Sequence, residues 1–145
     1  MAAKAILLSV RPKYAKKIFD GTKTVELRRI CPRITAGDLV FVYVSSPIKA
    51  LVGAFKVDRI VSAPPDELWA DIGCQSGITW EEFNEYFRGV TVGFGIVIRD
   101  VWKLTKPVNL SNLKRQWPGF QPPQNYHYLT RRQTGDLFFS LSTDA

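Results

Sequence analysis

The chain has 145 residues, of which 46% are hydrophobic and 23% charged, and its formal net charge is +7. This length predicts about one domain, and so hydrophobic a composition excludes an intrinsically disordered chain. No apolar run approaches the roughly 20 residues of a membrane-spanning helix, and the apolar start is too short for a signal peptide, so we expect a cytoplasmic protein.

Positive charge is concentrated at the start of the chain. Residues 1–33 hold nine Lys and Arg residues against only Asp20 and Glu26, whereas residues 66–85 hold six acidic residues and no basic one. This polarity predicts one face that attracts phosphates, and an acidic segment that suits a basic protein partner. The alternative, that the charges only keep the protein soluble, stays open.

The chain is expected to begin with a strand and a helix. Ala5–Val10 is a short apolar run, which predicts a buried strand. Pro12 suits the first turn of a helix and Gly21 commonly ends one, so a helix is expected between them.

The next segment alternates between apolar and polar residues. Val25 and Leu27 face one way, and Thr24, Glu26 and Arg28 face the other. This pattern predicts a half-buried strand with a polar face.

Later segments predict more strands around a helical insert. The expected strands are Leu39–Val44, 50–60, 92–104 and 125–129, and the expected helices are Pro65–Ile72 and 80–88. Thr79 and Glu82 have the spacing of a capping box, and Gly53 indicates a bulge or a close backbone approach. We expect a turn or short helix at 107–112 and an irregular loop at 116–124.

These elements predict an α+β fold of the barrel type. One domain would span residues 1–145, with an acidic helical insert at about 62–89 and a C-terminal extension at about 130–145. The apolar run from Leu137 to Phe139 indicates that this extension packs against the domain.

The segment Lys23-Thr24-x-Glu26-x-Arg28 is the strongest candidate site. A strand face that carries a hydroxyl, a carboxylate and a guanidinium must be wet or ligand-bound, because an unpaired buried charge is costly. The carboxylate can accept from the amino group of a base, and the arginine can meet a phosphate or a carbonyl. An internal ion pair between Glu26 and Arg28 is the alternative.

A catalytic role would need Lys23 as the base, with a lowered pKa, and Glu26 as its partner. A zinc site needs about four ligands, and Cys31, Cys74 and His127 do not supply them in any usual spacing, so we expect no metal and no cofactor. His127 lies between two tyrosines, and we expect it to be structural.

Two loops add candidate contacts. Ser45 and Ser46 end a strand, where hydroxyls often line a pocket, and the segment from Pro122 to Tyr126 offers amides and an aromatic ring to an unpaired base. An ordinary turn explains either loop equally well. The tryptophans are expected to be core residues, except that Trp117, in a loop, could stack on a base.

The order of these motifs resembles the ASCH domains of the PUA-like superfamily over about residues 7–129. The matching residues are Leu8-Ser9-x-x-Pro12-x-Tyr14, Gly21-x-Lys23-Thr24-x-Glu26-x-Arg28, Gly37-Asp38, Ser45-Ser46-Pro47, Gly93-Phe94 and Pro122-Pro123-Gln124. The resemblance implies a β-pseudobarrel of about five or six strands with helices at its rim. It also implies a cleft for RNA, single-stranded nucleic acid or a modified nucleobase, and a role in RNA metabolism or transcription regulation.

The expected ligand contacts combine the motif with the loops. They are Ser9, Arg11, Lys13, Lys23, Thr24, Glu26, Arg28, Ser45, Ser46, Gln124 and Tyr126.

The resemblance also implies two enzymatic alternatives. One branch of ASCH-like proteins hydrolyses N4-acetylcytidine with a lysine, a threonine and a glutamate. Lys23 matches the lysine, but Glu26 stands at the threonine's place and no acid stands near Gln75 and Ser76. Another branch is reported as ribonucleases, for which Lys23 and Glu26 are the candidate acid/base pair.

Overall fold

The structure is a computed structural model that describes residues 4–144, with side chains described as far as residue 137. Its elements are β1 (Ala5–Val10), α1 (Pro12–Asp20), β2 (Val25–Arg28), β3 (Leu39–Val44), β4 (Ala50–Ala63), α2 (Pro65–Ile72), η1 (Gly73–Gln75), α3 (Trp80–Tyr86), β5 (Gly93–Asn109), α4 (Leu110–Gln116), β6 (Tyr126–Tyr128) and α5 (Arg131–Asp144).

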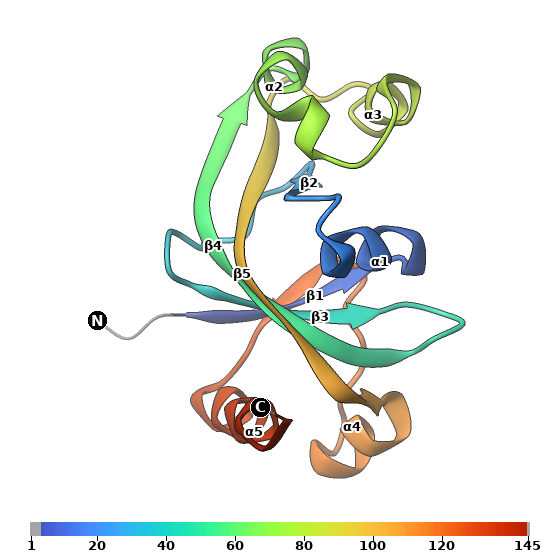
Figure 1. The fold of residues 1–145 in the computed structure, drawn as a ribbon, viewed down its shortest axis with the longest axis vertical. Coiled ribbons are helices and arrows are strands. Elements are labelled where there is room, and N and C mark those ends of the chain that lie inside the picture. Colours follow the sequence, from blue (N-terminus) through green and yellow to red (C-terminus); the bar gives the residue numbers. More distant parts are fainter. Residues whose placement is uncertain (1–3, 145) are drawn as a thin grey trace.

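Six strands form one curled sheet in the order β2-β5-β4-β3-β1-β6. β1 and β3 are parallel, and the other neighbouring strands are antiparallel. β4 and β5 are long and bend from the end near α4 to the end near α2 (Figure 1). At the open side of the sheet, Nη2 of Arg28 on β2 donates to the Ser9 carbonyl on β1 at 3.1 Å. The expected α+β pseudobarrel is therefore confirmed.

Local signals explain the elements that were predicted well. Pro12 starts α1, and Gly21 ends it in the left-handed conformation at φ 88°. The Thr79 hydroxyl accepts from the Glu82 amide, and the Glu82 carboxylate accepts from the Thr79 amide, so the capping box at α3 is confirmed. Gly53 is a close approach, because a Cβ there would lie 2.2 Å from the Trp102 carbonyl oxygen.

Each face of the sheet has its own hydrophobic core. Leu7 on β1 points to the face that α4 and α5 cover through Leu113 and Leu137, whereas Ile6 and its neighbours point to the face that α1 covers. A third cluster joins the insert helices α2 and α3 to β2. This cluster positions the insert beside the polar residues of β2.

β2 is not half-buried as expected. Glu26 is 6% exposed and Arg28 9% exposed, so the polar face is as covered as the face of Val25 and Leu27. The insert packs on the apolar side, and residues of the insert and of surrounding loops together enclose the polar side. Sequence alternation shows that two faces differ in polarity, but it does not show what covers each of them.

The turn or short helix predicted at 107–112 is confirmed only in part, because a helix begins at Leu110 but the residues before it belong to a strand. β5 continues to Asn109, which pairs with Ala50 of β4, and α4 starts directly after it. Pro107 falls within a register irregularity between Leu51 and Gly53 of β4, where the missing amide N–H breaks no regular ladder bond.

The prediction for Trp117 is also wrong. Trp117 is 8% exposed, its Nε1 donates to Asp136, and it belongs to the same core cluster as Leu137 of α5. The C-terminal segment is thus a helix that packs on the domain, and the side chains of Phe138 and Phe139 lie outside the described residues. Conversely, Trp80 and Trp102 are partly exposed, although Trp80 still packs on Trp69 and Phe83.

The two cysteines are free, with Cys31 partly buried and Cys74 exposed. Within the described part of the chain, no group of three or more His, Cys, Asp or Glu side chains is placed to hold a metal ion. No helix of that part has the length and apolar character needed to cross a membrane.

Candidate functional site

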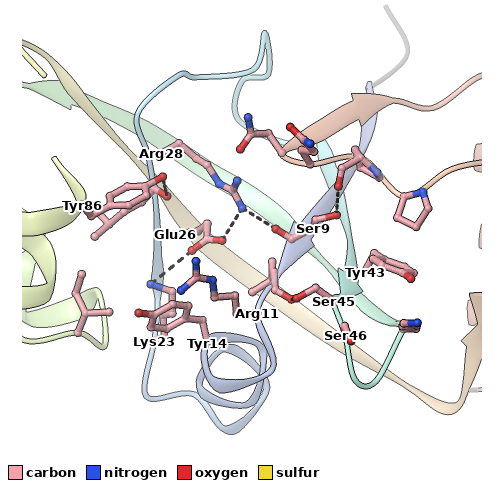
Figure 2. A pocket seen from close by; sticks show the side chains of 18 of the residues that line it. Ser9, Arg11, Tyr14, Lys23, Glu26, Arg28, Tyr43, Ser45, Ser46 and Tyr86 are labelled. Carbon is pink, nitrogen blue, oxygen red and sulfur yellow. Dashed lines mark hydrogen bonds and ion pairs between the residues drawn. The ribbon is translucent and has the colours of Figure 1, made fainter. Parts of the chain in front are cut away.

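A cleft of about 570 Å³ opens between β2, the start of α1, the loop after β3, the insert and the loop before β6 (Figure 2). Its polar lining comes from all of these elements. The polar and charged lining residues are Ser9, Arg11, Tyr14, Lys23, Glu26, Arg28, Tyr43, Ser45, Ser46, Lys49, Glu82, Tyr86, Gln124 and Asn125.

Glu26 lies between two cations at the centre of the cleft (Figure 2). Its Oε1 is 3.5 Å from Nζ of Lys23, and its Oε2 accepts from Nη2 of Arg28 at 3.1 Å. The internal ion pair considered from the sequence therefore exists, and it also lines a cleft. Because a carboxylate has about four acceptor positions, these two partners leave positions for a ligand donor.

Lys23 is held from the side of the insert. Its side chain is 2% exposed, and Nζ donates to the Ser76 carbonyl at 2.5 Å. Nζ also lies 5.5 Å from the centre of the Tyr14 ring. Burial lowers the pKa of Lys23, although Glu26 acts in the opposite direction. The insert thus fixes the lysine of the motif as part of the cleft wall.

Arg28 has one donor that the protein does not use. Its Nη2 contacts Glu26 and Ser9, but Nε is buried and has no hydrogen-bond acceptor among the described residues. Buried donors without a partner are uncommon in native proteins. The unused donor is consistent with a site that is completed by a ligand.

The loop before β6 is fixed to the sheet by Ser9. The Ser9 hydroxyl donates to the Pro123 carbonyl at 2.6 Å, and the Ser9 amide donates to the Asn125 carbonyl at 2.9 Å. These bonds hold Gln124 and Asn125 on the side of the cleft opposite the insert, where their amides can bind a polar edge.

Most of the predicted contacts line the cleft. They are Ser9, Arg11, Lys23, Glu26, Arg28, Ser45, Ser46 and Gln124. Three predicted residues are absent from its lining. Lys13 is exposed and binds Glu82, whereas Tyr126 lines a separate hollow. Thr24 precedes β2, is exposed, and uses its amide on the Gln75 carbonyl. The expectation that Thr24 shares the strand face of Glu26 is therefore wrong.

Several lining residues had not been predicted. Tyr14 lies on α1, and Tyr43 belongs to a strand that is buried throughout. Tyr86 lies in the insert and Lys49 in the turn after β3. Burial raises the pKa of Tyr43, so its hydroxyl stays protonated at neutral pH and can donate. Only the polar turn around Ser45 and Ser46 indicated that Tyr43 and Lys49 flank a site.

Glu82 connects the insert to α1 at the rim of the cleft. Its carboxylate accepts from the Tyr14 hydroxyl at 3.1 Å, from Lys13 at 3.3 Å and from the Thr79 amide at 3.1 Å. The Thr79 amide, followed by Lys13, lowers the pKa of Glu82 to about 2. The rim is therefore an ionised contact at neutral pH.

His127 lies away from the cleft. Its ring meets Phe120 edge-on at 5.7 Å, and burial lowers its pKa. It is a packing residue on the face of β6 opposite Tyr126 and Tyr128.

Comparisons with known proteins agree with this geometry. The family model described as ASCH domain matches residues 8–121. The ASCH domain-containing ribonuclease of Zymomonas mobilis is 31% identical over 134 residues, which cover 92% of this chain and 90% of that protein. The crystal structure of ASCH from Zymomonas mobilis matches with a TM-score of 0.89 at 30% identity and covers 94% of either chain.

A more distant likeness concerns the fold alone. The N-terminal domain of McrB from Staphylothermus marinus matches with a TM-score of 0.59 at 10% identity, over 100% of this chain and 96% of that one. The family match spans most of the chain and includes the cleft motif. The chain therefore belongs to the ASCH domain family.

Proposed function

We propose that this protein binds single-stranded RNA and holds one unpaired nucleotide in the cleft. The observation that carries the proposal is the buried carboxylate of Glu26, which lies on the cleft between Lys23 and Arg28. Replacing such buried ion pairs with apolar residues is often neutral or stabilising, so stability gives little reason for this arrangement. A ligand that needs both hydrogen-bond acceptors and hydrogen-bond donors explains the arrangement better.

The chemistry of the lining matches a nucleotide. Glu26 can accept from an exocyclic amino group, and the amides of Gln124 and Asn125 can meet the other polar atoms of a base edge. Arg11 and Lys49 are exposed cations at the cleft, suited to phosphate. A volume of about 570 Å³ is typical of small-ligand sites, so the cleft accommodates a nucleotide rather than a duplex.

Binding of labelled oligonucleotides tests this proposal. Fluorescence anisotropy at low salt should show that a single-stranded RNA of mixed sequence binds, and that the same RNA in a duplex binds more weakly. Arg11→Ala and Lys49→Ala should each weaken binding several-fold, because each removes one phosphate contact. Arg88→Ala is the matched control, since Arg88 is an exposed cation outside the cleft. Absence of binding to the unchanged protein at low salt would reject the proposal.

A second candidate function is ribonuclease activity, which the similarity to the Zymomonas mobilis ribonuclease favours. Cleavage of RNA needs a base to take a proton from the 2′-hydroxyl and an acid to protonate the leaving oxygen. We infer that the Glu26 carboxylate is the base and that the adjacent Lys23 ammonium, whose pKa burial lowers, is the acid. Tyr43 offers a second proton donor in the same cleft.

Product analysis separates this candidate from binding alone. Incubation of the labelled RNA should yield shorter fragments on a denaturing gel, and Lys23→Ala should abolish them. Tyr43→Phe, which keeps the ring, should slow cleavage if that hydroxyl donates a proton. RNA that stays intact after long incubation with the unchanged protein would exclude the ribonuclease and leave the binding proposal standing. The amidohydrolase alternative has less support, because Gln75 and Ser76, beside Lys23, stand where that activity would need an acidic residue.

A further inference from the structure

A second hollow of about 520 Å³ is lined by Lys4, Cys31, Arg33, Tyr126 and Tyr128, none of which lines the cleft. Two separate chain segments lead to it from the cleft. Arg28 lines the cleft, and Cys31, three residues later, lines the hollow. Asn125 lines the cleft, and the next residue, Tyr126, lines the hollow. Because a chain of three residues spans at most about 11 Å, lining residues of the two hollows lie within that distance of one another along both segments.

The hollow presents aromatic rings. Tyr126 and Tyr128 project from the same face of the edge strand β6, and their rings meet edge-on at 5.7 Å. Tyr128 is 46% exposed, and its hydroxyl oxygen accepts from the Arg33 amide at 2.8 Å. The hydroxyl is thus held by a hydrogen bond while much of the side chain is exposed to solvent. A ring held in this way can stack on a base.

Cations surround these rings. Lys4 and Arg33 are both exposed, and neither forms an ion pair with a carboxylate within the described residues. Burial raises the pKa of the Cys31 thiol, so the half-buried Cys31 adds no negative charge at neutral pH. Two unpaired cations beside an open tyrosine suit a nucleotide, whose base can stack and whose phosphate needs positive charge.

We infer that this hollow is a second nucleotide subsite, which binds the residue of single-stranded RNA next to the one in the cleft. The inference rests on the proposed function and adds to it the path that the RNA takes over the surface. The RNA would leave the cleft past Arg28 and Asn125, stack one base on Tyr128, and place a phosphate near Lys4 and Arg33.

Oligonucleotide length distinguishes the subsite from the cleft. A mononucleotide occupies the cleft alone, whereas a hexanucleotide can reach both hollows. Tyr128→Ala should weaken hexanucleotide binding about tenfold and leave mononucleotide binding unchanged, because stacking on one ring is lost. Tyr128→Phe keeps the ring and should restore binding. Arg33→Gln should lower the salt dependence of hexanucleotide binding by about one phosphate contact.

The control is Trp102→Ala, because Trp102 is 39% exposed and lines neither hollow. Hexanucleotide affinity that stays unchanged in Tyr128→Ala but falls in Lys49→Ala would overturn the second subsite and retain the cleft. Failure of Tyr128→Phe to restore binding would overturn stacking as its basis. Failure of the unchanged protein to bind either ligand would reject the proposed function, and the subsite with it.

Discussion

Glu26 is buried, and two neighbouring cations stabilise its negative charge. At 6% exposure it has little access to water, and Lys23 and Arg28 replace the lost hydration. Arg28 in turn binds the Ser9 carbonyl, so the same residue closes the open side of the sheet. The same three charged residues therefore stabilise the fold and line the candidate site, so a change in the Glu26 carboxylate affects both stability and binding.

Replacement of Glu26 by Gln tests this dependence. The amide keeps the shape but leaves two buried cations without a counter-charge, so the free energy of unfolding should fall by on the order of 3 kcal/mol. Urea denaturation measures the change. Glu85→Gln is the control: Glu85 pairs with Arg88 on the surface with 68% of its side chain exposed, and its loss should change stability by less than about 1 kcal/mol. Equal effects of the two substitutions would contradict the buried pair.

The insert helix α3 is held in place by its own first turn. Glu82 caps the helix through Thr79 and also binds Lys13 and Tyr14 of α1, so a single carboxylate joins two elements across the rim of the cleft. Its pKa of about 2 lies below the ordinary value of 4.5. A lowered carboxylate pKa means that the contact stabilises the fold when ionised, and that protonation removes the effect.

The variant Glu82→Gln should reveal this pH dependence. Gln can still form the capping box, so the substitution removes mainly the charge. The unchanged protein should have the higher melting temperature at pH 6. That advantage should shrink as the pH falls from about 4.5 towards about 2, where the carboxylate becomes protonated. Melting temperatures followed by circular dichroism across this range give the comparison, and a constant difference would argue against the ionised contact.

Charge is distributed unevenly over the whole molecule. The basic residues 4–33 form β1, α1, β2 and the segment that follows, which line part of the cleft and of the second hollow. Six of the 13 acidic residues lie on α2 and α3, at the opposite end of the long β4–β5 pair from α4 (Figure 1). A polyanion should therefore approach from the basic side.

Salt dependence measures this effect for the molecule as a whole. With about two or three phosphates neutralised, RNA affinity should fall about tenfold between about 50 and 200 mM salt. Anisotropy titrations at several salt concentrations give the slope. The exposed variant Lys49→Ala should reduce the slope by about one contact, whereas Arg88→Ala should leave it unchanged. A slope near zero would mean that phosphates contribute little to binding.

Features that depend on neighbouring residues in the chain could be predicted from the sequence. The bounds of β1 and α2, the start and end of α1, and the capping box at Thr79 follow from proline, glycine and hydrophobic spacing. These signals act within one or two turns, where hydrogen bonds and backbone conformation are local. The motif from Lys23 to Arg28 was identified for the same reason, because its residues are adjacent.

Features that depend on distant contacts needed the tertiary structure. Trp117 is buried in a cluster that includes Leu137 of α5, and Thr24 lies outside the cleft, with its amide bound to the Gln75 carbonyl of the insert. Tyr43 and Lys49 join the site only because the sheet curls to bring the end of β3 towards β2. The sequence by itself determined the family, the local elements and the charged motif. The tertiary structure decided which side chains share the cleft, because burial arises from contacts between segments that are far apart in the chain.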